Sequence, residues 1–365
     1  METRDQIEKI CREFRIPGEM IRLEQMNNGN INATYRTAFE NAGVRKEYTV
    51  QKINMYVFPY PKRIMSNIDL ITGHIRQKLS EQGESMDKSM HFYHTAEGNN
   101  FVVDSQGFWR VYKYIQGVET YNETEDLHII RETGRAFGRF QMQLADFDAS
   151  QLFEIIPNFH NTRSRLAVFF KHVKEDSCGR VEEIGPQIER IRALRGEAVR
   201  LNELLDAEEI PLRVTHNDTK INNVLFDEKT GDARTVIDLD TVMPGLAMHD
   251  FGDGVRFCAS TAAEDEADLT KVSLDLAKYR AFAEGFLGET GDVLEPMEIE
   301  TMALGAFTMT VELAVRFFDD YITGDRYFRT AYPRHNLVRG YCQLHLAEDM
   351  LRKRAQMDAI VRELC

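Results

Sequence analysis

Long apolar runs are missing from this sequence. No stretch reaches the roughly 18 apolar residues of a membrane-spanning helix, and the opening METRDQIEKICREF lacks the apolar centre of a signal peptide. Positive charge is also scarce, because 45 lysines and arginines stand against 59 aspartates and glutamates, a net charge of −14. General binding to nucleic acid or to anionic membranes needs clustered cations. We therefore expect no nucleic-acid partner and no membrane partner.

Cysteine is sparse and scattered. The five cysteines are odd in number and none has CxxC spacing, which argues against a disulfide framework and against a zinc site. The apolar share of 43% and the charged share of 28% are ordinary for a globular chain and exclude disorder. We expect a cytoplasmic enzyme with reduced thiols, and no obligate protein partner is evident.

The first part of the chain has the texture of a small, mostly antiparallel sheet. Its 365 residues correspond to about two domains at ~150 residues each. Apolar spacing predicts a helix over 1–15 and another over 62–79, which has isoleucines along one face. Alternating residues bounded by Asn and Gly predict strands within 20–55 and at 101–104 and 108–115.

From about residue 124 the apolar spacing becomes helical. One strand-rich island, at 212–240, interrupts a series of predicted helices over 163–175, 185–206, 263–288, 294–322 and 336–362. We therefore predict an α+β, bilobal chain. Residues 1–117 form a β-rich N-terminal lobe, and residues 118–365 form a mostly helical lobe, with the active site in the cleft.

The island contains the residues that point to chemistry. Asp218 follows one strand, Asn223 opens the next, and Asp238 ends a third in Val236-Ile237-Asp238. Hairpin connections would bring these oxygen-bearing side chains to one end of the strands, and such oxygens suit Mg²⁺. Lys220 can reach the same point as a cation. A base, two metal-binding oxygens and a lysine are what phosphoryl transfer to an alcohol requires.

The order His-x-Asp-x-Lys-x-x-Asn, followed by an apolar-apolar-Asp strand, resembles the catalytic loop and metal-binding Asp of the kinase superfamily. The form VTHNDTKINNVLFD…TVIDLDTVMPG…DFGDGVRF looks like the aminoglycoside phosphotransferase and choline kinase branch. Within that branch the chain is most similar to the bacterial N-acetylhexosamine 1-kinases. The likeness extends to NGNINATY, FWRVYKYIQG and RFFDDYITGDRYF…YPRHNLVR.

The resemblance implies a role for individual residues. Asp218 would be the catalytic base and Lys220 would contact the transferred phosphoryl group. Asn223 and Asp238 would hold Mg²⁺, and ATP would be the co-substrate. Two further groups would bind ligands. The nucleotide would be bound by the hinge Tyr112, Tyr114 and Ile115 with strand residue Gln51, and the sugar acceptor by Asn30, Arg316 and Tyr327 together with Asp218.

Two features depart from the kinase pattern. Around Gly29 there is no G-x-G-x-x-G, so phosphate cover by that loop is less certain. At the position of the kinase strand lysine stands Gln51, with Lys52 beside it, and only one of the two can point into the cleft. Asp69 is the candidate partner for that position on the predicted helix.

The neighbours of the motif have structural readings. We interpret His216 as a support of the catalytic loop, and Asp250 and Asp253 as caps that brace it. Asp240 is either a further metal contact or a local hydrogen-bonding residue. The DFG at 250–252 lies too far past the catalytic loop to be the kinase metal motif, which Asp238 fits better.

Several functions compete for this motif. A long activation loop and an Ala-Pro-Glu are absent, so a small acceptor is favoured over a protein. We predict ATP- and Mg²⁺-dependent phosphorylation of the anomeric hydroxyl of N-acetylglucosamine or N-acetylgalactosamine. The alternatives are a kinase of another small alcohol, of aminoglycoside, choline or homoserine type, a metal-dependent phosphoesterase, and a catalytically silent nucleotide-binding protein. The last should have lost Asp218 or Asp238, and both are present.

Overall fold

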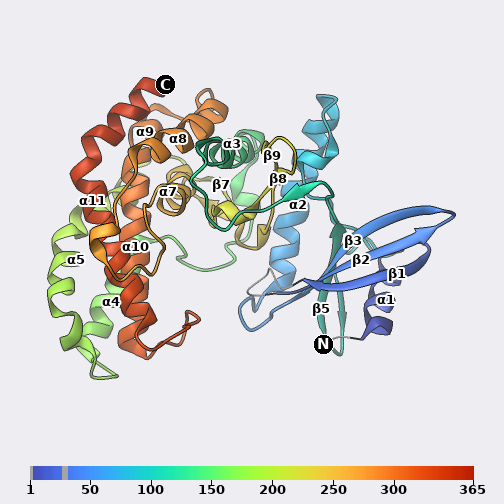
Figure 1. Ribbon diagram of the computed structural model, residues 1–365, viewed down its shortest axis with the longest axis horizontal. Helices are drawn as coiled ribbons and strands as arrows, with labels where there is room; N and C mark the ends of the chain where they lie inside the picture. Colours follow the sequence, from blue (N-terminus) through green and yellow to red (C-terminus); the bar gives the residue numbers. More distant parts are fainter. Residues whose placement is uncertain (1–2, 27–31) are drawn as a thin grey trace. The chain divides into compact units, whose positions relative to one another are not determined.

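A computed structural model describes residues 3–26 and 32–365 of the chain. The chain forms two compact units, Met1–Glu119 with Arg234–Val242, and Thr120–Ala233 with Met243–Cys365. The predicted boundary follows residue 117, and the first stretch of this unit ends at Glu119. The unit also takes in the segment that carries Asp238. The predicted α+β class, a β-sheet followed by a helical part, is confirmed (Figure 1).

The first unit is built on a five-stranded antiparallel sheet of order β1-β2-β3-β5-β4. The unit also contains the short strand β6 (Val118–Glu119). The sheet strands are β1 (Glu19–Met26), β2 (Ala33–Asn41), β3 (Val44–Ile53), β4 (Val102–Asp104) and β5 (Gly107–Lys113).

Two helices accompany the sheet. In α1 (Arg4–Glu13), Thr3 caps the first turn and helical spacing buries Ile7, Ile10 and Cys11, which pack on one face of the sheet. In α2 (Pro61–Glu81), proline occupies the first helical position, where its fixed φ suits a helix start. Four isoleucines of α2 are buried at the predicted spacing: Ile64, Ile68, Ile71 and Ile75.

The register of β3 against β5 decides which side chains share a face of the sheet. Gln51 lies opposite Arg110, and Lys52 lies opposite Trp109. Trp109 is fully buried in the core cluster beneath α1. Because side chains alternate along a strand, Gln51 and Arg110 belong to the opposite face, which settles the relative placement of Gln51 and Lys52.

The second unit is helical around α10 (Met302–Thr323), which is buried along most of its length and packs against α4, α7 and α11. Its other helices are α3 (Leu127–Gln143), α4 (Thr162–Glu175), α5 (Gly185–Ala198), α6 (Arg200–Asp206), α7 (Ala247–Cys258), α8 (Leu276–Thr290), α9 (Pro296–Glu300) and α11 (His335–Leu364). Three strands of the island lie in this unit: β7 (Arg213–Thr215), β8 (Val224–Asp227) and β10 (Met243–Gly245). The fourth, β9 (Ala233–Val236), belongs to the first unit from Arg234 onward. Among the helices of the described residues, none is long and apolar enough to cross a bilayer.

One predicted helix was too long. The sequence pattern suggested a helix over 263–288, but α8 begins only at Leu276. Asp275 accepts hydrogen bonds from the amides of Ala277 and Lys278, and this cap fixes the start of the helix.

Glycines allow α3 and α8 to approach closely. A Cβ at Gly134 would overlap the carbonyl oxygen of Phe282, and a Cβ at Gly138 would lie 2.5 Å from that of Phe286. On the other helix, a Cβ at Gly285 would overlap the carbonyl oxygen of Arg131. The two backbones therefore touch at these three positions, and any larger residue would push the helices apart.

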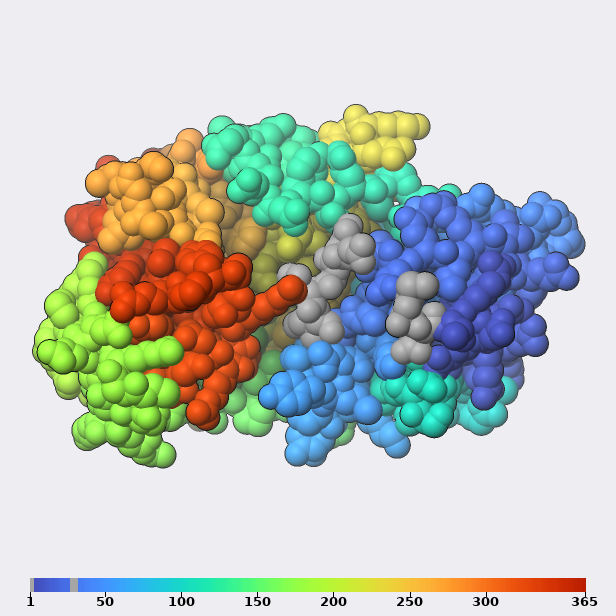
Figure 2. All heavy atoms as spheres, turned by 60° about the horizontal axis from the view of Figure 1, so that its bottom comes forward, coloured from blue at the N-terminus to red at the C-terminus, as the bar shows by residue number. Residues whose placement is uncertain are grey.

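Elsewhere in this unit, ion pairs join segments that are distant in sequence. Arg180 contacts Asp325 at 2.6 Å, and Arg334 contacts Glu183 at 2.6 Å. In the space-filling view the yellow-green surface of α4 and α5 adjoins the orange-red surface that follows α10 (Figure 2). The residues after α10 are thus tied to the segment between α4 and α5.

Candidate active site

The catalytic loop lies between β7 and the 3₁₀ turn η4 (Ile221–Asn223), and helix α7 holds its backbone. Asp250 accepts hydrogen bonds from the amides of His216 and Asn217, both at 2.8 Å. Asp253, one turn later, accepts from the amide of Thr219 at 3.2 Å. The loop backbone is thereby fixed at three successive points, including Asn217, whose φ of 63° is left-handed.

Packing also holds the loop. His216 is fully buried, and its ring meets the rings of Phe137 and Phe140 edge-on at 5.3 and 5.7 Å. Gln141, also on α3, donates to Asp250 at 2.7 Å. His216 therefore supports the loop, in keeping with its structural interpretation.

The loop presents Asp218 with two donors. Lys220 Nζ lies 2.7 Å from Asp218 Oδ1, and the Asn223 amide nitrogen donates at 2.9 Å to Asp218 Oδ2 and at 2.9 Å to its backbone oxygen. The side chain of Asp218 is 25% exposed, so a ligand can reach it. The three residues that the motif predicted in this loop are thus brought together.

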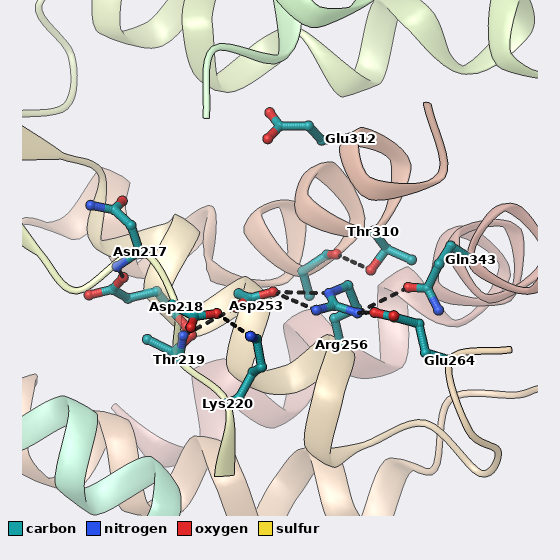
Figure 3. Close-up of polar contacts among 12 residues, drawn as sticks. Asn217, Asp218, Thr219, Lys220, Asp253, Arg256, Glu264, Thr310, Glu312 and Gln343 are labelled. Carbon is teal, nitrogen blue, oxygen red and sulfur yellow. Dashed lines mark hydrogen bonds and ion pairs between the residues drawn. The ribbon is translucent and has the colours of Figure 1, made fainter. Parts of the chain in front are cut away.

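Charges alternate along this part of the unit (Figure 3). Next to Asp218 and Lys220 come Asp253 and Arg256, whose side chains meet at 2.9 Å, and then Glu264, 2.9 Å from Arg256. Burial favours the neutral form of Lys220, but Asp218 outweighs it and raises the pKa of the lysine. Lys220 therefore stays a cation beside the carboxylate.

The DFG sequence at 250–252 is not a metal motif. It lies in the first turns of α7, and the carboxylate of Asp250 is fully buried against the loop amides. Burial raises the pKa of Asp250, although the amide donors oppose that shift. Asp250 and Asp253 brace the loop, as the sequence suggested.

Asp238 belongs to the first unit, where it precedes the 3₁₀ turn η5 (Leu239–Thr241) with a left-handed φ of 60° and ψ of 58°. Two residues later, Asp240 is buried and forms an ion pair with Arg110. Its second oxygen accepts from the Asn32 amide at 2.8 Å. Asp240 is therefore a hydrogen-bonding residue in this structure, one of the two alternatives that the sequence left open.

Gln51 takes part in the same cluster. Its amide nitrogen donates to Thr34 at 2.9 Å, and its oxygen accepts from Arg110 Nε at 2.8 Å and Nη2 at 2.6 Å. Asp69, the candidate partner of this strand position, instead contacts His94 at 2.9 Å. The cation that contacts Gln51 is thus Arg110 of β5.

The predicted hinge keeps an unused backbone edge. The amide of Tyr114 donates to the carbonyl of Glu47 at 3.2 Å, whereas neither the N–H nor the C=O of Ile115 is hydrogen-bonded within the described part of the chain. A donor and an acceptor on one residue match the edge of an adenine base. Burial raises the pKa of Tyr112 to about 12, so its phenol is neutral.

Arg316 and Tyr327 meet at the end of α10. The helix ends at Gly324, whose φ of 103° turns the chain back, and Arg316 Nη2 lies 3.3 Å from the Tyr327 hydroxyl. Asp319 contacts His172 at 2.7 Å, and Asp320 accepts from the amides that follow the turn. The two carboxylates at helical spacing from Arg316 are therefore engaged elsewhere.

Of the residues predicted to bind the acceptor, Asn30 lies outside the described residues.

Two residues around these sites were not predicted from the sequence. Arg110 was not singled out, although an arginine inside an apolar strand is itself a signal of a buried charge pair. His160 was also missed. It contacts Glu312 at 2.9 Å and the carbonyl of Asn217 at 3.3 Å, and so connects the catalytic loop to α10.

The chain is similar to known proteins in sequence family and in fold. Residues 73–284 match the profile of the phosphotransferase enzyme family. Aminoglycoside phosphotransferase from Alicyclobacillus acidocaldarius has a similar structure, with a TM-score of 0.61, 12% identity and coverage of 98% of this chain and 96% of that chain. Choline kinase from Cryptosporidium parvum aligns with a TM-score of 0.56, 13% identity and 99% of each chain. Ethanolamine kinase from Plasmodium vivax aligns with a TM-score of 0.54, 13% identity and 94% and 89% coverage.

Proposed function

The chain belongs to the phosphotransferase enzyme family, and from this premise we propose that it transfers the terminal phosphoryl group of ATP to the anomeric hydroxyl of an N-acetylhexosamine. The observation that carries the proposal is the catalytic loop, in which a partly exposed Asp218 lies between Lys220 and Asn223. Phosphoryl transfer needs positioning and charge stabilisation more than covalent chemistry, and a braced loop supplies both.

In this proposal Asp218 accepts the proton of the sugar hydroxyl and orients its oxygen. Lys220 contacts the transferred phosphoryl group. Asn223 and Asp238 offer oxygen ligands, which Mg²⁺ prefers. The side-chain nitrogen of Asn223 donates to Asp218, whereas its side-chain oxygen has no partner among the described residues. Bound Mg²⁺ would neutralise charge on the phosphates.

For the nucleotide, the free backbone edge of Ile115 supports adenine binding at Tyr112–Ile115, with Gln51 on the strand nearby. All five cysteines are free thiols, and we propose a cytoplasmic location on the basis of the sequence. A small-molecule acceptor and ATP are the proposed partners.

For the acceptor, the pairing of Arg316 with Tyr327 supports a neutral sugar. The guanidinium lies within 5.2–5.6 Å of three ring centroids, those of Phe159, Tyr327 and Phe328. A cation among aromatic rings, beside a phenol that is 66% exposed, can hydrogen-bond ring hydroxyls while the phenol ring packs on the sugar.

An ADP-release assay tests this proposal on N-acetylglucosamine, N-acetylgalactosamine, aminoglycosides, choline, ethanolamine and homoserine, with free phosphate measured in parallel. We expect turnover with the N-acetylhexosamines. Turnover with only one of the other alcohols would overturn the sugar assignment. Phosphate release that needs no acceptor would show transfer of the phosphoryl group to water and would also overturn the sugar assignment.

The Arg316→Ala variant tests the acceptor site. We expect the KM for the sugar to rise at least ~10-fold, equivalent to ~1.4 kcal/mol, while the KM for ATP stays constant. Arg329→Ala is the matched control, because Arg329 is an exposed arginine of the same segment. An unchanged sugar KM in Arg316→Ala would place the acceptor elsewhere.

A further inference from the structure

The turn that follows Asp238 is held by a buried charge. Arg110 and Asp240 are 3% and 2% exposed, and they are separated by 130 residues in sequence. Burial disfavours the charge on Arg110, but Asp240 outweighs it and raises the pKa of the guanidinium. Since Arg110 is sealed from solvent, it acts on other protein groups rather than on a ligand.

Three separate elements hold the segment 238–242. Arg110 of β5 takes one oxygen of Asp240, and Asn32, just before β2, takes the other at 2.8 Å. Helix α2 contributes Asn67, whose amide donates to the carbonyl of Val242 at 2.9 Å. All of these contacts lie within the first unit.

Asp238 stands between the end of β9 and this clamped turn. Its backbone is left-handed, a conformation uncommon for non-glycine residues but one that aspartate adopts more readily than most. The residues that directly follow Asp238 are held by the contacts above, so the direction of its carboxylate depends on that turn. Gln51 completes the arrangement. Its side-chain oxygen accepts two hydrogen bonds from the Arg110 guanidinium and so fixes the plane of that group.

We infer that Arg110 is a positioning residue for the metal-binding carboxylate: by holding Asp240, with Gln51 as its support, it sets the orientation of Asp238. This inference rests on the proposed role of Asp238. It also gives Gln51 a reason to stand where kinases carry a lysine, since the cation that contacts Gln51 comes from the neighbouring strand β5.

Metal binding can be measured without turnover. The probe is Mn²⁺ followed by electron paramagnetic resonance in the presence of a non-hydrolysable ATP analogue. In Arg110→Gln we expect the Kd of Mn²⁺ to rise at least ~10-fold, as is usual when a group that orients a metal ligand is removed. If Asp240 were instead a ligand waiting for metal, removing its arginine would free a carboxylate and lower the Kd, which would overturn the inference.

Arg110→Gln leaves a buried unpaired carboxylate and can fail to fold, so the double variant Arg110→Gln/Asp240→Asn is needed. Removing both charges relieves that penalty while the bracing ion pair stays broken. We expect its melting temperature to recover and its Mn²⁺ Kd to stay raised. If both the melting temperature and the Mn²⁺ Kd returned to the wild-type values, the Arg110–Asp240 pair would only stabilise the fold, and the inference would be overturned.

Two references complete the design. Arg213→Gln/Glu298→Gln removes an ion pair of 2.5 Å in the second unit, of which the glutamate is buried, and should leave the Mn²⁺ Kd unchanged. Asp238→Ala should lose Mn²⁺ binding. Wild-type binding by Asp238→Ala would overturn the proposed metal role and this inference with it. Loss in Asp238→Ala with no change in the double variant would overturn the inference alone.

Discussion

The catalytic loop and the turn at 238–242 are both held in place by buried carboxylates, but the carboxylates lie on opposite partners. In the loop, acids on a helix accept hydrogen bonds from backbone amides of the segment that they brace. In the turn, the braced segment itself supplies the acid, Asp240, and a strand supplies the cation, Arg110. Each segment positions one aspartate of the motif, Asp218 or Asp238.

The difference has consequences for what each segment tolerates. Bracing through backbone amides does not depend on which side chains the loop carries, so Asp218 and Lys220 are left for chemistry. Bracing through a side chain makes Asp240 and Arg110 depend on each other, because either one alone would be a buried unpaired charge. The predictions below test this contrast.

The largest effect should come from the residue that the loop presents. Asp218→Asn keeps the shape of the side chain and removes the base, and we expect kcat to fall by ~10²–10⁴-fold. Circular dichroism and ATP-analogue binding should be unchanged, because the loop is held from α7. Retention of more than about a tenth of kcat would contradict the role of Asp218 as base.

Breaking the brace of the loop should lower stability. In Asp250→Asn, an NH₂ group replaces one carboxylate oxygen. Because each oxygen accepts a backbone N–H of the loop, this NH₂ group then faces a backbone N–H, donor against donor. We expect the free energy of unfolding to drop by about 3 kcal/mol, near the upper cost of an unsatisfied buried group, and kcat to fall as well. Urea denaturation measures the first quantity.

Asp275→Asn is the control for that experiment. It caps α8, where Asn is as good a cap as Asp, so stability should be nearly constant. If Asp250→Asn were as mild as this control, the loop would not depend on α7.

Acid should weaken the helical unit through His249. Burial, then the nearby His160, lowers the pKa of His249 from the ordinary 6.5 to about 3. Because the unfolded chain binds the proton more readily between these values, stability falls as pH falls below 6.5. Between pH 7 and pH 5 the loss from this group should be about 2 kcal/mol.

Comparing urea midpoints of the wild type and His249→Gln at the two pH values isolates this contribution. The variant should lose less stability on acidification than the wild type. Equal losses in both proteins would show that His249 is protonated in the folded state.

The smallest effect should come from the helix contact of the turn. Asn67→Ala removes the hydrogen bond to the carbonyl of Val242, and we expect a loss of about 1 kcal/mol in thermal unfolding. Ser66→Ala, at the neighbouring position of α2, should be near neutral. A Mn²⁺ Kd that rose more in Asn67→Ala than in Arg110→Gln would assign the positioning of Asp238 to α2 instead.

Local patterns in the sequence predicted the parts of the site that are close in the chain. Asp218, Lys220 and Asn223 come from one loop, and Arg316 and Tyr327 lie on either side of a glycine turn, so spacing alone brings them together. The roles assigned to these residues stay predictions. The identity of the fold class followed from the change of apolar spacing near residue 124.

Contacts that depend on strand register could not be predicted. Arg110 meets Asp240 only because β5 pairs with β3 at a particular register and the 234–242 segment joins the first unit. The late start of α8 was not predicted either. The acid-rich segment 263–268 resembles the exposed surface of a helix, and the true helix start is marked only by Asp275, which caps the first turn of α8.

The glycine contact between α3 and α8 bears on how this protein can be recombined. Gly134 and Gly138 on one helix and Gly285 on the other allow backbone to contact backbone, although residues 144–275 separate the helices in the chain. A chimera that exchanges α3 with a relative must exchange α8 as well, and a cut between them splits a matched pair. Crossover points within 144–275 would therefore yield folded hybrids only where both parents carry small residues at all three positions.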